Sequence, residues 1–204
     1  RDLSGFSVSG AGDDNGDGID DVIIGARGST TVNGDQSGRS YVVFGKTDEF
    51  SAVINLSDLD GTNGFKLDGE AAGDISGDSV SQAGDVNGDG TDDLIIGARR
   101  AGPNGVWSGR SYVIFGKSTE FTSPFQLSTL DGTNGFKLDG EAESDQAGTW
   151  VSEAGDVNGD GIADIIIGAD KAGPNGDLSG RSYVVFGSSS GFSSPLQLST
   201  LDGT

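Results

Sequence analysis

The chain has 204 residues, of which 37 are glycine and only 33% are hydrophobic. Its net charge of −20 argues against nucleic acid as a partner, because phosphate binding needs a basic surface, and no apolar run of 18 residues predicts membrane insertion. Cysteine and histidine are both absent, so a disulfide framework and Ser/Cys–His catalysis are excluded within this sequence.

The first unit of the chain, residues 1–74, contains four short apolar segments bounded by glycine. They lie at residues 6–9, 22–24, 41–44 and 65–67. β-Branched and aromatic residues dominate them, so each segment predicts a strand. The second and third segments are apolar without alternation, which is typical of strands that are buried on both faces.

Asp, Asn and Gly fill the loop that follows the first predicted strand, in the pattern D-x-N-x-D-G-x-x-D. Side-chain oxygens fall at positions 1, 3, 5 and 9 and a carbonyl is available at position 7, as a hard divalent cation requires. The glycine at position 6 permits the sharp turn. An EF-hand would place Glu at position 12, where this chain has Ile24, Ile96 or Ile167.

The same loop occurs three times, and the copies start 72 and 71 residues apart, at Asp13, Asp85 and Asp156. Oxygen donors alone favour Ca²⁺ over zinc, copper or iron, so we expect three structural Ca²⁺ sites. An ordinary solvated turn is the alternative, and three copies in register argue against it. The expected ligands are Asp13, Asn15, Asp17, Ile19 and Asp21; Asp85, Asn87, Asp89, Thr91 and Asp93; and Asp156, Asn158, Asp160, Ile162 and Asp164.

The strand segments recur with the loops, so the chain is a repeat of about 71 residues. Residues 75–145 form the second unit, and residues 146–204 form a third unit that stops before its fourth strand. Four antiparallel strands repeated at this period predict an all-β fold of β-propeller blades. A sandwich or an open solenoid is the alternative, but a sandwich does not explain the repeat. A propeller needs about 4–8 blades, so we expect a larger propeller or one completed by association of copies.

These motifs resemble the FG-GAP repeats of integrin α-subunit propellers and their bacterial relatives. In the first unit the resemblance is carried by residues 5–9, the loop at 12–21 and the apolar run at 22–26. The leading Phe of the family pattern is replaced by Ser4, Ser76 or Ala147, and the Pro of G-A-P by Arg27, Arg99 or Asp170. These departures favour repeats of large bacterial surface proteins over an animal receptor.

Weak Ca²⁺ sites indicate a location outside the cell or on its surface, because cytosolic Ca²⁺ would leave them empty. The resemblance places the loops between strands 2 and 3 on the rim opposite the metal loops. These loops, at residues 27–38, 99–109 and 170–180, vary between units, as recognition surfaces do. Trp107 is the candidate ligand-binding residue, since a rim tryptophan can stack on a sugar or a partner side chain. Local packing is the alternative for Trp107. The arginine that opens each third strand predicts an ion pair with a nearby Asp.

A Ca²⁺-binding, non-catalytic extracellular β-propeller module for adhesion or for protein or carbohydrate binding agrees best with these features. The alternatives are a structural building block of a surface layer or fibre, and an accessory domain of a secreted hydrolase. The expected partners are an extracellular protein or glycan, together with self-association or continuation in a longer chain.

Overall fold

The computed structural model describes residues 1–202, and three β-sheets make up its regular structure. In the first sheet the strands β1 to β4 pair antiparallel in sequence order, and the second and third sheets repeat this arrangement. The strands are β1 (Ser7–Gly12), β2 (Asp21–Ala26), β3 (Arg39–Val43) and β4 (Gly64–Asp68); β5 (Ser79–Gly84), β6 (Asp93–Ala98), β7 (Arg110–Ile114) and β9 (Gly135–Asp139); and β10 (Trp150–Gly155), β11 (Asp164–Ala169) and β12 (Arg181–Val185). Three short 3-10 turns, η1 (Leu56–Asp58), η2 (Leu127–Thr129) and η3 (Leu198–Thr200), accompany them.

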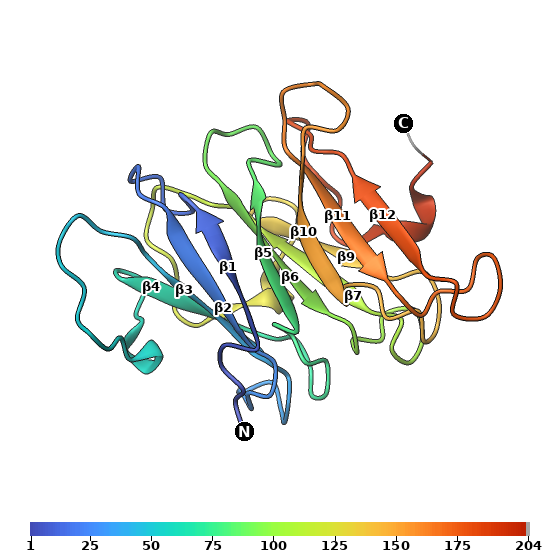
Figure 1. Cartoon of the computed structure of the whole chain (residues 1–204), viewed down its shortest axis with the longest axis horizontal. Coiled ribbons are helices and arrows are strands. Elements are labelled where there is room, and N and C mark those ends of the chain that lie inside the picture. Colours follow the sequence, from blue (N-terminus) through green and yellow to red (C-terminus); the bar gives the residue numbers. More distant parts are fainter. Residues whose placement is uncertain (203–204) are drawn as a thin grey trace.

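The three sheets stand side by side, and their first strands lie next to one another in the order β1, β5, β10 (Figure 1). The apolar core lies between the sheets. One cluster joins the first sheet to the second, with Phe65 and Val42 packed among Leu94 and Tyr112. A second cluster joins the second sheet to the third in the same way. The all-β prediction is therefore confirmed, and the arrangement is consistent with adjacent propeller blades.

Burial of the second strand of each sheet depends on its position in the row. Every residue of β6 is buried, as the unbroken apolar run predicts. In the outer sheets one face is open, so that Val22 of β2 is 46% exposed whereas its counterpart Leu94 in β6 is 0% exposed. A sheet of this kind therefore needs a neighbour on each side to bury its apolar residues.

A fifth strand, which the repeat pattern does not predict, adds to two of the sheets. The strand β8 (Phe125–Gln126) pairs parallel with β4 of the preceding unit, and β13 (Leu196–Gln197) pairs parallel with β9. The prediction of purely antiparallel four-stranded sheets is wrong at this point. Two residues are too short for a periodic signal, and the pairing partner belongs to another unit.

The segment that leads into β8 and includes it packs against the preceding unit. We call this segment the clasp (residues 117–126, repeated at 188–197). The ring of Phe121 stacks on that of Phe65, with 4.0 Å between centroids and an interplanar angle of 3°. The Ser123 hydroxyl accepts the Lys66 N–H at 3.2 Å and donates to the Leu59 carbonyl at 2.9 Å. In the second clasp, Phe192 and Ser194 make the same contacts with the second unit.

The predicted unit boundaries at residues 74 and 145 stay predictions, although the sheets follow the repeat. In the described part of the third unit the sheet has three strands, and its last predicted residues, 203–204, lie outside the described residues.

Truncation of the clasp ring tests how much of the stability comes from contacts between units. We expect Phe121→Ala to lower the free energy of unfolding by about 3–5 kcal/mol, because the ring is 4% exposed and stacked on Phe65. Phe50 occupies the same place in the first unit but is 50% exposed, so Phe50→Ala is the matched control and should cost under about 1 kcal/mol. Urea unfolding measures both, and equal losses would contradict the clasp.

Candidate metal centre

The β5–β6 loop folds around its own backbone amides. The Asp85 carboxylate accepts N–H bonds from Gly88 at 2.7 Å, Asp89 at 3.0 Å and Gly90 at 2.8 Å. Asn87 Oδ1 accepts the Asp89 N–H, and Asp89 Oδ1 accepts the Thr91 N–H. The side-chain oxygens at positions 1, 3 and 5 therefore turn towards the same short stretch of backbone.

The other two loops repeat this arrangement. In the β10–β11 loop, Asp156, Asn158 and Asp160 accept the corresponding five hydrogen bonds from four amides. The β1–β2 loop keeps four of these bonds, made by Asp13, Asn15 and Asp17. The glycines at position 6 have φ between +87° and +92°, which is the conformation for which the pattern requires glycine.

The aspartate at position 9 is buried, whereas the side-chain donors at positions 1, 3 and 5 are partly or fully exposed. Asp93 is 0% exposed and accepts the N–H groups of Val86 and Gly116, both at 2.9 Å, and Asp164 repeats both bonds. Asp21 accepts the Gly45 N–H at 2.7 Å, and its Oδ2 is buried without a hydrogen-bond partner. Burial raises the pKa of Asp93 to about 8 and that of Asp21 to about 6.

These residues fit a hard cation through the chemistry of their donors. Every candidate ligand is an oxygen. Asp85 Oδ1 accepts two N–H groups, but Asp85 Oδ2 and Asp89 Oδ1 accept one each and keep a second lone pair for a metal. Among residues 1–202, however, no three carboxylates gather into a preassembled metal cluster. The structure turns positions 1, 3 and 5 of each loop towards the same backbone stretch, and it holds position 9 on backbone amides.

Trp107 lies at the other end of the sheet, in the turn between β6 and β7. Its side chain is 46% exposed, the Arg100 guanidinium lies 5.8 Å from the ring centroid, and its carbonyl accepts the Gln146 N–H. Its φ is +57°, and the equivalent Gln36 and Leu178 have φ of +50° and +55°. Each of these loops thus exposes a different side chain from the same position. The backbone there has a positive φ, which bulky residues disfavour.

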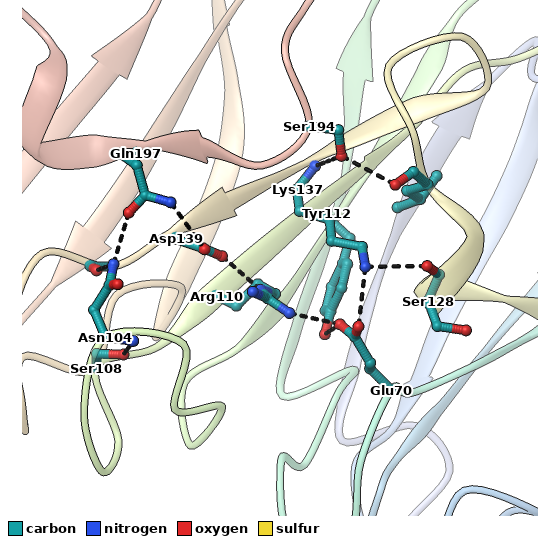
Figure 2. Close-up of polar contacts among 12 residues, drawn as sticks. Glu70, Asn104, Ser108, Arg110, Tyr112, Ser128, Lys137, Asp139, Ser194 and Gln197 are labelled. Atoms are coloured by element: carbon teal, nitrogen blue, oxygen red, sulfur yellow. Dashed lines mark hydrogen bonds and ion pairs between the residues drawn. The ribbon is translucent and has the colours of Figure 1, made fainter.

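A polar network between units was missed in the sequence, and its centre is Glu70 (Figure 2). Glu70 Oε2 accepts Arg110 Nη1 at 2.6 Å and the Tyr112 hydroxyl at 3.2 Å, while Oε1 accepts Lys137 Nζ at 2.9 Å. Burial raises the pKa of Glu70, but the hydrogen bonds and charges of Lys137 and Arg110 outweigh it and hold the pKa below its usual value. The sequence signal that could have revealed this network is the recurrence of Glu70 as Glu141, one repeat later.

The arginines that open the third strands form ion pairs, as predicted for two of them. Arg39 Nε lies 2.5 Å from Asp68 Oδ1, and Arg110 Nε lies 2.6 Å from Asp139 Oδ1. Arg181 pairs with Glu141 of the preceding unit. These cations are therefore engaged in holding strands and units together.

Two of the residues that replace the family proline, Arg27 and Arg99, bind the same carboxylate. Asp78 of the second unit accepts Arg27 Nη1 and Arg99 Nε, each at 2.6 Å. One period later the acceptor and the donor exchange places. Thr149 stands where Asp78 was and Asp170 where Arg99 was, and the Thr149 hydroxyl donates to Asp170 at 3.0 Å. The Arg27–Asp78 pair thus joins the first unit to the second, whereas Thr149 and Asp170 both belong to the third unit.

Repeated antiparallel sheets with an oxygen-rich loop after the first strand define the class of this protein. Residues 76–114 and 148–185 match the family model of the FG-GAP repeat. The chain is therefore a member of the FG-GAP repeat family, and the matched segments belong to its second and third units.

The similar proteins are much longer than this chain. It is 32% identical over 200 residues to "Integrin alpha pat-2" of Caenorhabditis elegans, which covers 94% of this chain and 14% of the relative. Identity to "Integrin alpha-PS2" of Drosophila melanogaster is 33% over 194 residues, covering 92% of this chain and 12% of the relative. "Phosphatidylinositol-glycan-specific phospholipase D" of Bos taurus is 30% identical over 198 residues, covering 93% of this chain and 21% of the relative.

Integrin-like FG-GAP repeats are non-catalytic domains. Within residues 1–202, none of the helices has the length and apolar character required to cross a bilayer.

Replacement of Glu70 tests the network between units. We expect Glu70→Ala to lower the free energy of unfolding by about 2 kcal/mol near pH 7, because Arg110 and Lys137 lose a shared acceptor. A lowered folded-state pKa contributes stability above the unfolded value near 4.3, and this contribution is lost as the pH falls through the folded value. The variant should therefore differ least from the parent in acid.

Urea unfolding at several pH values measures this difference. Glu49→Ala is the control, because Glu49 is exposed. A loss of stability that is constant down to pH 3 would contradict an ionic role for Glu70.

Proposed function

We propose that the chain is a Ca²⁺-binding, non-catalytic part of an extracellular or cell-surface β-propeller that recognises a protein or a carbohydrate. The observation that carries this proposal is the repetition of one loop, three times, with its oxygen side chains turned inward at positions 1, 3 and 5. Membership of the FG-GAP family and similarity to integrin α chains support it. Ca²⁺ would act here as a structural ion.

The energetic argument for the cation is electrostatic. Carboxylates about 4 Å apart repel by roughly 4 kcal/mol per pair at an effective dielectric constant near 20. A site with a Kd of ~10⁻⁴ M, which is usual for extracellular modules, would contribute about 1.4 kcal/mol at ten times that concentration. Three sites would contribute about 4 kcal/mol, a large part of the stability of a typical domain.

Recognition would take place at the rim opposite the metal loops. The three loops there differ in sequence while the strands hardly change, and Trp107, Gln36 and Leu178 offer different side chains from the same backbone position. A tryptophan that is half exposed can stack on a sugar ring or on a partner's side chain. The partner on this proposal is an extracellular protein or glycan.

One comparison favours a second function, as an accessory domain of a secreted hydrolase. The phospholipase D relative shares 30% identity over 93% of this chain, which is only 21% of the relative. On this alternative the repeats would accompany a catalytic domain elsewhere in a longer protein.

The calcium proposal is tested by thermal unfolding with excess Ca²⁺ and with excess EDTA. We expect the melting temperature to rise strongly in Ca²⁺, and the triple variant Asp17→Asn, Asp89→Asn, Asp160→Asn to lose most of that rise. The control is Asp2→Asn, Asp48→Asn, Asp177→Asn, which removes the same charge from exposed positions outside the loops. If the parent chain melted at one temperature in both solutions, Ca²⁺ would have no structural role.

The proposed binding role of Trp107 is tested on an array of glycans and extracellular matrix proteins. We expect Trp107→Ala to weaken binding at least tenfold, since loss of a stacked aromatic contact costs about 1.5 kcal/mol or more. Leu178→Ala is the matched control, because Leu178 is 60% exposed at the same place in the third unit. Unchanged binding by the Trp107 variant would assign the ring to local packing.

A further inference from the structure

A chain of polar side chains connects the rim loop of the second unit to the clasp of the third unit (Figure 2). Asn104, in the loop between β6 and β7, donates from Nδ2 to the Gly140 carbonyl at 2.8 Å and to Gln197 Oε1 at 2.7 Å. Gln197 is the last residue of the clasp, and the pairing of β13 with β9 puts it beside Asp139, at the rim end of the sheet. Its Nε2 donates to Asp139 Oδ2 at 3.0 Å. The loop that contains Trp107 is therefore bonded to a residue of the next unit.

The Asp139 carboxylate decides which way the two amide side chains point. Asp139 is 4% exposed, and its Oδ1 accepts Arg110 Nε at 2.6 Å. A carboxylate that is paired with an arginine can only accept, so the nitrogen of the Gln197 amide must face it. The oxygen of Gln197 is then turned towards Asn104, whose Nδ2 has two hydrogens and meets two acceptors. The donors and acceptors of this bridge therefore match in one arrangement only.

The first unit has the same bridge to the clasp of the second unit. Asn33 Nδ2 donates to the Gly69 carbonyl and to Gln126 Oε1, both at 2.7 Å. Gln126 Nε2 in turn donates to Asp68 Oδ2 at 3.4 Å. The bridging residues are thus identical in two units whose rim loops differ in sequence.

The backbone of the rim loop needs support at Trp107. Its φ of +57° is disfavoured for a bulky residue, and such a residue persists only where its surroundings hold it. Part of the support is local, since Ser108 Oγ accepts the Asn104 N–H at 3.2 Å, and this bond recurs in the third unit. Leu178, at the same place in the third unit, has a φ of +55°. The turn itself therefore selects the conformation, and the bridge acts on how firmly the loop is held.

We propose that the clasps of the second and third units position the rim loops of the first and second units, through the asparagine–glutamine bridge. Asn104 and Gln197 are then positioning residues for Trp107. This inference rests on the proposed recognition at the rim, and it adds that the recognition loop is held by residues of two units. A change in a clasp would alter recognition by the preceding unit without any change in the loop itself.

Hydrogen exchange of the loop amides tests the bridge without a ligand. The amides of Asn104, Ser108 and Gly109 donate hydrogen bonds inside the second rim loop, so their exchange reports how often the loop opens. We expect Gln197→Ala to speed this exchange about fivefold, which corresponds to the ~1 kcal/mol of one net hydrogen bond. Exchange in the first rim loop should stay at the parent rate.

Gln126→Ala is the matched control, because it removes the same side chain from the other clasp. It should speed exchange in the first rim loop, at Asn33 and Gly38, and leave the second loop unchanged. Gln197→Glu separates hydrogen bonding from bulk. It keeps the size of the side chain but sets a second carboxylate against Asp139, so it should loosen the second loop at least as much as Gln197→Ala does.

The two rim loops decide the outcome, because each clasp variant is expected to act on one of them. Parent rates in the second loop of both Gln197 variants, or equal acceleration in both loops, would overturn the bridge. Recognition at the rim is judged separately, by the binding of Trp107→Ala. A loop that is loosened by Gln197→Ala in a chain where Trp107→Ala binds normally would support the bridge and refute recognition at Trp107. An unchanged loop together with weakened binding by Trp107→Ala would do the reverse.

Discussion

Burial of each sheet against its neighbour is the interaction on which the rest of this structure depends. The strand β6 is buried over its whole length because sheets flank it on both sides. The corresponding strands β2 and β11 have exposed residues, Val22 and Ile166, where β6 has buried ones. A single unit of about 71 residues therefore leaves part of its apolar strand surface exposed, and the two larger core clusters form between units. A smaller cluster of Ala26, Tyr41, Val43 and Leu59 lies within the first unit.

Contacts between units need directional partners as well as apolar area, because a chain of net charge −20 is subject to strong internal repulsion. The clasp provides one set, through the stacked ring of Phe121 and the hydroxyl of Ser123. The Glu70 network provides another, in which one carboxylate joins Arg110 and Lys137 of the next unit. Both sets fix the angle and spacing between sheets more narrowly than apolar packing alone would.

The strands and metal loops could be predicted from the sequence because each is a local pattern repeated in register. The loop from Asp85 to Asp93 contains its own hydrogen-bond donors and acceptors, so its conformation needs no distant residue except at position 9. The apolar runs likewise give their secondary structure without knowledge of their neighbours. Repetition in three copies strengthens both predictions, and the metal sites themselves stay a prediction.

The features that were missed depend on residues that lie far apart in the sequence. The strand β8 is two residues long and pairs with β4 almost sixty positions earlier, so no periodic signal marks it. Glu70 meets Arg110 across a joint between units. A sequence pattern describes one element at a time, whereas these contacts exist only when two units are brought together.

The antiparallel order of the strands places the contacts between units and the varied loops at opposite edges of each sheet. The β1–β2 and β3–β4 connections leave the sheet at the same end, so the metal loop and the clasp lie at one edge, and the β2–β3 loop with its varied side chain lies at the other. Contacts at the first edge, such as those of Phe121 and Ser123 in the clasp, can fix the spacing of the units without constraining the varied side chains at the second edge. The rim that contains Trp107 is therefore free to vary from unit to unit while the packing between units stays the same, which is the arrangement that a recognition surface on a repeated scaffold requires.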